Sequence, residues 1–257
     1  MMLRHIFTIA KNTFRETMRD RILLSALLVV FLMILFSIFI GSISIEQDVR
    51  MITNFSLTVI YLLQMFVAIF VGSMLMYKEI ERRTFFLIIP KPIKRESIIL
   101  GKALGLTLTT AVVTFVSTLA LYAILFIKGG NIYFVPILIS LFLSILESVL
   151  VIMISILFSG MTSPILSAVY TIGFFLIGHS SEIMRYLIAT SDSTIRVFVI
   201  KVAYYLLPNL EKFNTRNDVI YEKITSLTVI VLTVLYALCY ATIIFLITRL
   251  NFKKKEF

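Results

Sequence analysis

Residues 22–40 read ILLSALLVVFLMILFSIFI, an apolar run without a charged side chain. A helix rises about 1.5 Å per residue, so a run of this length covers most of the roughly 30 Å hydrocarbon core of a bilayer. The run exceeds the roughly 7–15 apolar residues of a cleaved secretory signal, and no small-residue cleavage site follows it. We therefore expect an uncleaved first membrane span from Ile22 to Ile40.

Similar apolar runs recur along the rest of the chain. We predict further spans at residues 55–77, 98–127, 133–158, 165–188 and 227–248. Apolar residues make up 60% of the sequence and charged residues 15%, against about 45–50% and about 25% in soluble domains. The composition predicts an all-α polytopic membrane protein, one transmembrane domain over residues 1–257, with about six helices in the lipid bilayer.

The basic residues indicate how the spans are oriented. In a soluble protein the net charge of +10 would suggest nucleic acid, but here the basic residues lie between apolar runs, so we expect no nucleic-acid partner. They gather in the head before residue 22, in the break at 78–97 and in the tail after residue 248. Positive charge marks the cytoplasmic side, so both termini are predicted to be cytoplasmic.

Two segments outside the spans have a predicted place of their own. Residues 1–21 place apolar and basic side chains on neighbouring sides of a helix, which is typical of an amphipathic helix at the membrane interface. Residues 189–224 contain only a short apolar run, 197–207, interrupted by Lys201. A run so short favours an extracellular cap or a re-entrant segment over a seventh span.

Glu147 is the one acidic residue deep in a predicted span. It lies beside a stripe of serines at near-helical spacing, which favours close helix packing and predicts that Glu147 faces protein. Two interpretations stay open: a hydrogen-bonded packing residue, or an intramembrane polar site for a proton or cation. His179, near the end of the fifth span, is interpreted as a solvated histidine.

No pattern predicts catalysis by this chain. The only other histidine is His5, and the single cysteine is Cys239, so the sequence offers no zinc motif and no disulfide. Gly101-Lys102 is followed by Ala103, and Glu96 stands where a P-loop needs its first glycine. We expect no catalytic residue, metal or cofactor in this chain.

The break between the second and third spans is the most informative loop. Residues 78–97 begin with charged side chains and continue with an apolar stretch up to Ile89. Pro90 and Pro92 end any helix there, because the residue before proline avoids helical geometry. A short amphipathic helix and a stiff elbow are predicted; the alternative is a solvated loop whose basic residues only fix the topology.

The same segment resembles the permease subunits of ABC-2 type transporters. The resemblance is carried by Glu79, Thr84, Phe86-Leu87, Pro92-Ile93-Lys94-Arg95 and Leu100-Gly101-Lys102. A later stretch, Leu206-Leu207-Pro208-Asn209 with Phe213, resembles the NosY-like branch of these permeases. The family's length and six-span layout are similar over nearly the whole chain.

The resemblance implies a type V-like permease in the plasma or inner membrane of a prokaryote, working mostly as an exporter. It implies a homodimer, or a heterodimer with a related permease, and a separate cytoplasmic ABC ATPase that binds ATP and Mg. That ATPase would grip a coupling segment at Glu79, Arg82, Arg83, Thr84, Phe86, Pro92 and Arg95. The alternatives are an ion-driven carrier or channel, and a membrane scaffold without transport.

Overall fold

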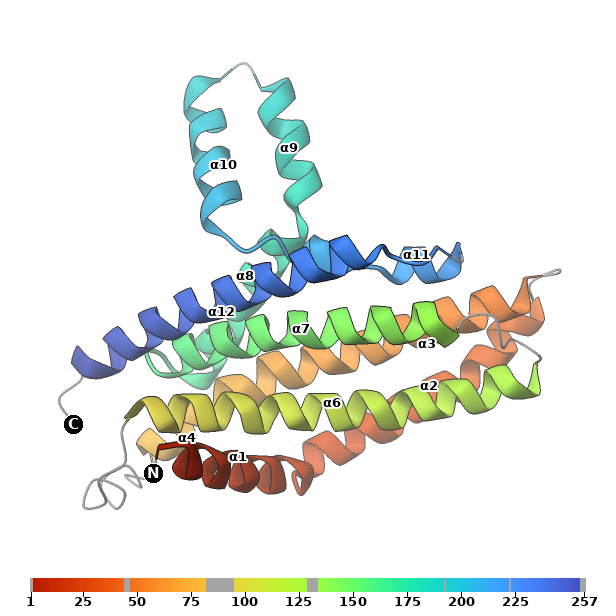
Figure 1. The fold of residues 1–257 in the computed structure, drawn as a ribbon, viewed down its shortest axis with the longest axis horizontal. Helices are drawn as coiled ribbons and strands as arrows, with labels where there is room; N and C mark the ends of the chain where they lie inside the picture. The colour runs from red at the N-terminus through yellow and green to blue at the C-terminus, as the bar shows by residue number, and fades with distance from the viewer. Residues whose placement is uncertain are drawn as a thin grey trace.

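The computed structural model describes residues 2–43, 47–81, 95–128, 134–191, 193–221 and 223–254, with the backbone alone at 78–81, 95 and 253–254. Every regular element in these ranges is a helix. The long helices lie side by side along one axis (Figure 1). Within these ranges five helices are long and apolar enough to cross a membrane, and a sixth is added if a bent pair of helices counts as one span. The predicted all-α polytopic class with about six spans is confirmed.

The chain opens with two helices that share a short turn. α1 (Met2–Met18) lies alongside α6, and α2 (Arg21–Ile43) is the first long apolar helix (Figure 1). The Asp20 carboxylate accepts a hydrogen bond from the Ile22 N–H at 2.9 Å, which satisfies one of the free amide groups at the start of α2.

The apolar stripe of α1 is partly buried against the bundle and partly exposed on its surface. Ile6 and Ala10 are buried in the bundle, together with Thr13 and Thr17. Leu3 and Phe7, which belong to the same stripe, are 82% and 71% exposed. α1 is therefore docked on the bundle by one edge of its apolar face and keeps the other edge free to enter lipid.

The second span contains a change of helix type. α3 (Asp48–Phe66), a π-helical turn η1 (Val67–Val71) and α4 (Gly72–Glu81) follow one another without a break, and residues 48–77 qualify as one span. π-helical turns inside helices are rare and often occur at functional sites.

Two helices form the centre of the bundle and others surround them. α6 (Arg95–Ile127), α7 (Phe134–Ser159) and α12 (Leu227–Lys254) complete the set of long helices. In the most apolar window, 72% of the second span and 61% of α7 are buried, against 22% of α2 and 17% of α12. The second span and α7 are thus the core, and α2 and α12 present apolar side chains outward.

The predicted span at 165–188 is not one straight helix. α8 (Pro164–His179) and α9 (Ser181–Thr190) meet at a bend of 61°. A Cβ atom at Gly178 would lie 2.8 Å from Leu210 Cγ and 2.9 Å from the Pro208 carbonyl oxygen. A later part of the chain therefore packs directly on the end of α8, a contact that hydropathy along 165–188 does not reveal.

The segment after the bend is helical as well. α9 and α10 (Thr194–Leu206) form a pair that stands away from the bundle (Figure 1). The chain then returns through the 3₁₀ turn η3 (Leu210–Phe213) and α11 (Arg216–Ile220) to α12. α10 lies in the region 189–224, for which a cap or re-entrant segment is predicted, whereas α9 falls mostly within the predicted span 165–188.

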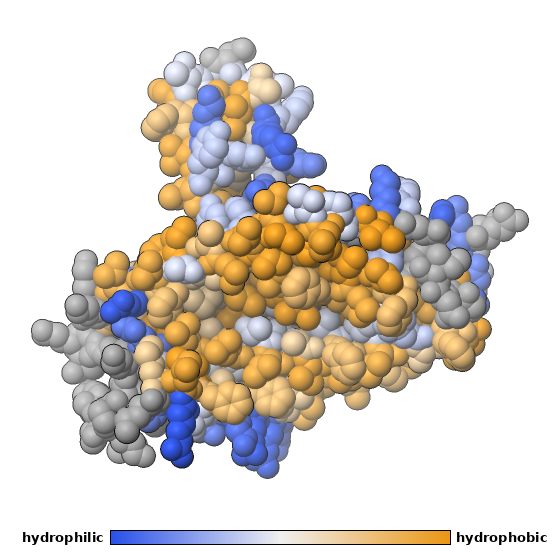
Figure 2. Space-filling view, in the orientation of Figure 1, coloured by the Kyte–Doolittle hydropathy of each residue, from blue (hydrophilic) through white to orange (hydrophobic). Residues whose placement is uncertain are grey.

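The surface is divided as a membrane protein requires. Figure 2 shows an apolar band over the visible face of α6, α7 and α12, with hydrophilic side chains gathered along α1 and at the ends of the bundle. Large apolar side chains on α2 and α12, among them Leu28, Phe39 and Leu232, are more than half exposed. Such a band matches lipid rather than water.

Enlarging Gly105 is expected to loosen α1. A Cβ at Gly105 would lie 2.6 Å from the Ala10 carbonyl oxygen, a backbone atom that cannot rotate away. We expect Gly105→Val to cost about 1–3 kcal/mol of stability through overpacking and to lower the midpoint of thermal unfolding followed by circular dichroism. Gly173→Val is the matched control, because nothing lies within 4 Å of a Cβ there. Equal midpoints for both variants would contradict this packing.

Candidate functional site

A buried carboxylate lies at the centre of α7. Glu147 is fully buried, and the serine stripe beside it is buried as well: Ser140, Ser144, Ser148, Ser155 and Ser159. The Tyr61 hydroxyl, from α3, donates a hydrogen bond to Glu147 Oε1 at 2.7 Å. Among the described residues, nothing hydrogen-bonds to Glu147 Oε2. Glu147 thus faces protein and holds one oxygen without a partner.

His179 joins this carboxylate from the end of α8. Its Nε2 atom lies 2.8 Å from Glu147 Oε1 and 2.9 Å from the Tyr61 hydroxyl oxygen. Its Nδ1 atom lies 2.9 Å from Oε2 of Glu211. The interpretation of His179 as a solvated histidine is wrong, because both ring nitrogens contact acidic side chains and only 19% of the side chain is exposed.

The far side of the site comes from η3 and α11. The Asn214 amide donates to Glu211 Oε1 at 2.9 Å, and Arg216 Nε donates to Asn214 Oδ1 at 3.0 Å. The Arg216 guanidinium also lies 3.8 Å from the centre of the Tyr61 ring, within the range of a cation–π interaction. We call Tyr61, Glu147, His179, Glu211, Asn214 and Arg216 the Glu147 cluster.

The segment that carries Glu211 is held at several other points. Leu210 and Phe213 are buried. The Asn209 N–H donates to the Tyr236 hydroxyl of α12 at 2.7 Å, and Lys212 Nζ lies 4.2 Å from the centre of the Tyr236 ring. The segment at residues 208–216 therefore joins α12 to α8 and holds Glu211, Asn214 and Arg216 in the Glu147 cluster.

Sequence reasoning found only one member of this cluster from its chemistry. Glu147 is conspicuous as an acid in an apolar run. Glu211 and Asn214 lie within the stretch that resembles the NosY-like branch, but that pattern concerns its leucine, proline and phenylalanine positions. Tyr61 and His179 carry no sequence signal that pairs them, because a residue separation of 118 gives no periodicity to detect.

A second set of contacts surrounds the predicted coupling segment. Glu79 lies in the last turn of α4, and Arg95 is the first residue of α6. Arg82, Arg83, Thr84, Phe86 and Pro92 lie outside the described residues. The predicted segment thus begins and ends on helices whose places in the bundle are known.

α4 is fixed to the bundle by hydrogen bonds to its backbone. The Ser159 hydroxyl, at the end of α7, donates to the Ser73 carbonyl at 2.6 Å and accepts the Met76 and Tyr77 N–H groups at 3.3 Å each. Lys102 of α6 is buried, and its ammonium donates to the Leu75 carbonyl at 2.6 Å. The lysine of the quoted Gly-Lys pair therefore joins α6 to α4.

α6 is fixed in the same region. A Cβ at Gly101 would lie 2.7 Å from Ile9 Cβ, so this glycine lets α1 approach α6 closely. Arg249, near the end of α12, forms an ion pair with Glu96 at 2.8 Å. Both helices that flank residues 82–94 are anchored, and we call these contacts the coupling-end junction.

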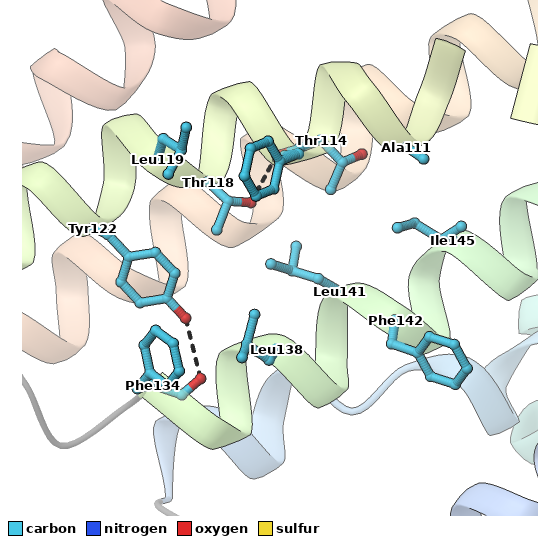
Figure 3. A pocket seen from close by; sticks show the side chains of 11 residues that line it. Ala111, Thr114, Thr118, Leu119, Tyr122, Phe134, Leu138, Leu141, Phe142 and Ile145 are labelled. Atoms are coloured by element: carbon cyan, nitrogen blue, oxygen red, sulfur yellow. Dashed lines mark hydrogen bonds between the residues drawn. The ribbon is translucent and has the colours of Figure 1, made fainter. Parts of the chain in front are cut away.

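A groove of about 430 Å³ lies between α6 and α7. Figure 3 shows Thr114 and Thr118 of α6 facing Leu138 and Leu141 of α7, with the Tyr122 hydroxyl donating to the Phe134 carbonyl at 3.1 Å. The groove is almost entirely apolar and offers no catalytic group. Within the part of the chain that the structure describes, no cluster of His, Cys, Asp or Glu is arranged to hold a metal ion.

A comparison of this sequence with known families decides what kind of protein has this geometry. The model of the family described as ABC-2 family transporter protein matches residues 15–179, which is more than half of the chain and extends from α1 to His179. The chain belongs to the ABC-2 transporter family. No curated protein matches it.

Membership in the ABC-2 family fixes the coarse function. The chain is a multi-pass membrane protein and the permease of an ABC transporter, a membrane component that is not itself catalytic. Permeases of this family associate with an ABC ATPase. The matched range contains the coupling-end junction apart from Ile9 and Arg249, and it ends on the histidine of the Glu147 cluster.

Removing the ammonium of Lys102 is expected to weaken the coupling-end junction. Lys102→Met keeps an apolar side chain of similar length but leaves the Leu75 carbonyl without this donor, which costs about 1–3 kcal/mol for a buried group. The midpoint of thermal unfolding should fall. Lys11→Met, at an exposed position of α1, is the control and should leave the midpoint unchanged. A Lys102→Met midpoint equal to that of the parent chain would count against the contact.

Proposed function

We propose that this permease is an exporter driven by ATP hydrolysis in a separate cytoplasmic ATPase subunit, which holds residues 79–95 as its coupling segment. ATP and Mg would bind to that subunit, since this sequence has no P-loop. The permease would work in the inner membrane of a prokaryote, paired with a second copy or a related permease. The stretch from Leu206 to Phe213 favours the NosY-like branch.

The observation that supports this proposal is the anchoring of both ends of the coupling segment. α4 is bound through its backbone to Ser159 and Lys102, and α6 contacts α1 and Arg249. A force applied between these ends would act on packed helices and not on a free loop. The segment itself supplies charged side chains, Glu79, Arg82 and Arg83, for contact with a soluble partner.

The position of the second span supports transmission beyond the junction. α4 continues through η1 into α3, and this second span is the most buried of the candidate spans among the described residues. A displacement of α4 therefore reaches the centre of the bundle through one continuous span. Interiors packed at protein density transmit such shifts because there is little free space to absorb them.

The ion-driven carrier needs paired charges in the membrane interior. The Glu147 cluster supplies such charges, but membership in the ABC-2 family places the chain among ABC permeases. We therefore do not propose a carrier.

Reversing the charges of the coupling segment should separate the two subunits. In the triple variant Glu79→Lys, Arg82→Glu, Arg83→Glu, we expect at least about a tenfold loss of the P-loop ATPase that co-purifies with the permease, because like charges oppose each other at the interface. ATP-dependent transport should fall in parallel.

The control for this variant reverses the same kinds of charge elsewhere. Glu182→Lys, Arg185→Glu, Arg196→Glu lies on the exposed α9–α10 pair and should keep the ATPase. If the coupling-segment variant retained the ATPase and full ATP-dependent activity, the assignment of this segment would be wrong.

The proposal also requires residues 79–95 to lie in the cytoplasm. With Cys239 replaced by Ala, a single cysteine introduced at Lys94 should react with a membrane-impermeant maleimide only after the membrane is opened. A cysteine at Tyr186, on the α9 helix, should react in intact cells. Reaction of the Lys94→Cys variant in intact cells would refute the orientation.

A further inference from the structure

When His179 is neutral, the Glu147 cluster has too few hydrogen-bond donors for the acceptor atoms that lie within bonding distance. Nε2 of His179 lies 2.8 Å from Glu147 Oε1, and Nδ1 lies 2.9 Å from Glu211 Oε2. Each is a hydrogen-bond distance, and each contact needs a proton between its two atoms. A neutral imidazole carries one N–H, and an ionised carboxylate carries none.

Both neutral tautomers leave one contact unsatisfied. If Nε2 carries the proton, the bare Nδ1 faces the Glu211 carboxylate. If Nδ1 carries it, the Tyr61 hydroxyl can donate to only one of Nε2 and Glu147 Oε1, although it lies 2.9 Å and 2.7 Å from them. In the first case two lone pairs meet at Glu211, whose side chain is 35% exposed. In the second case they meet at the fully buried Glu147, where this is costly.

One added proton resolves the conflict. An imidazolium donates from both nitrogens, to Glu147 and to Glu211, and leaves the Tyr61 hydroxyl free to donate to Glu147. The formal charges of Glu147, Glu211, His179 and Arg216 then sum to zero. Without that proton the same groups carry one net negative charge around a fully buried carboxylate, which is unfavourable at low dielectric.

We propose that the Glu147 cluster is a proton-binding site, in which His179 holds a proton between Glu147 and Glu211 and so fastens the 208–216 segment to the bundle. The groups that face His179 are Tyr61 from α3, Glu147 from α7, Glu211 from η3 and, through the Tyr61 ring, Arg216 from α11. Lys212 contacts Tyr236 instead, and Glu182 of α9 is exposed.

The proton has a structural role because the two carboxylates lie on different parts of the chain. Glu147 belongs to the core helix α7, and Glu211 belongs to the segment that returns from the α9–α10 pair. When the proton leaves at high pH, either Nδ1 of His179 no longer donates to Glu211, or Nε2 of His179 is left bare and repels the Glu147 carboxylate. The 208–216 segment would then separate from α8 more easily, at the place where Leu210 covers Gly178.

Histidine-selective ¹⁵N labelling of the full chain in lipid nanodiscs tests the site directly. The sequence has two histidines, so His5→Gln assigns both sets of ring signals. At about pH 7.5, roughly one unit above the pKa of a free imidazole, we expect His179 to show protons on both ring nitrogens. A bare ring nitrogen at His179 in the parent chain at this pH would overturn the proposal.

Glu211→Gln supplies the decisive variant. A glutamine amide can donate to Nδ1, so a neutral imidazole then satisfies both contacts, and His179 should lose its second proton by pH 7.5. Glu182→Gln, on the exposed face of α9, is the matched control and should behave as the parent chain does. If Glu211→Gln proves unstable, Glu147→Gln tests the same point from the other carboxylate, and retention of both protons in the variant would refute the site.

Hydrogen exchange tests the link to the segment. In the parent chain, exchange of backbone amides at residues 208–216, corrected for base catalysis, should rise by up to about tenfold per pH unit once the proton is lost. In Glu211→Gln the corrected exchange should not depend on pH. Corrected exchange in the parent chain that stays constant between pH 6 and pH 9 would refute the fastening role.

Discussion

A carboxylate inside an apolar helix must receive its hydrogen bonds from protein, because lipid offers none and the energetic cost of leaving it unpaired is several kcal/mol. Glu147 imposes this requirement on the bundle. Tyr61 and His179 meet it at Oε1, and meeting it fixes the relative positions of α3, α7 and the end of α8. His179 then brings in Glu211, so the return segment after the α9–α10 pair is held by the same requirement.

In the coupling-end junction, too, polar groups inside the bundle receive their hydrogen bonds from protein, and small residues allow the helices to approach closely. Ser159 and Lys102 satisfy backbone groups of α4, and Gly72 lets α4 approach Ser155 of α7 closely. Small side chains and backbone hydrogen bonds bring helices together in lipid, where apolar burial gives little preference for protein over lipid tails. The two helices that flank the coupling segment are therefore fixed by directional contacts.

The second span and α7 contribute to both regions. Tyr61 lies in α3 and Leu75 in α4, on one continuous helix that passes through the π-helical turn. On α7, Glu147 contributes to the cluster and Ser159 to the junction. The proposed site of ATPase contact and the proposed proton site are thus built on the same two central helices, which are also the most buried ones.

The sequence by itself determined the class of this protein and the approximate position of its long helices, because apolar length and the placement of basic residues are properties of the chain alone. It also pointed to Glu147, since a charge in an apolar run is visible without a fold, and its motif around Gly101-Lys102 led to the family that the match over residues 15–179 then established. It did not reveal the bend after His179, because Ser180 and Ser181 barely alter the hydropathy of the run.

Only the tertiary structure placed Tyr61, His179, Glu211 and Arg216 around Glu147. Those four residues and Glu147 lie on five separate elements, and their proximity depends on how helices pack in three dimensions, which no periodicity along one helix encodes.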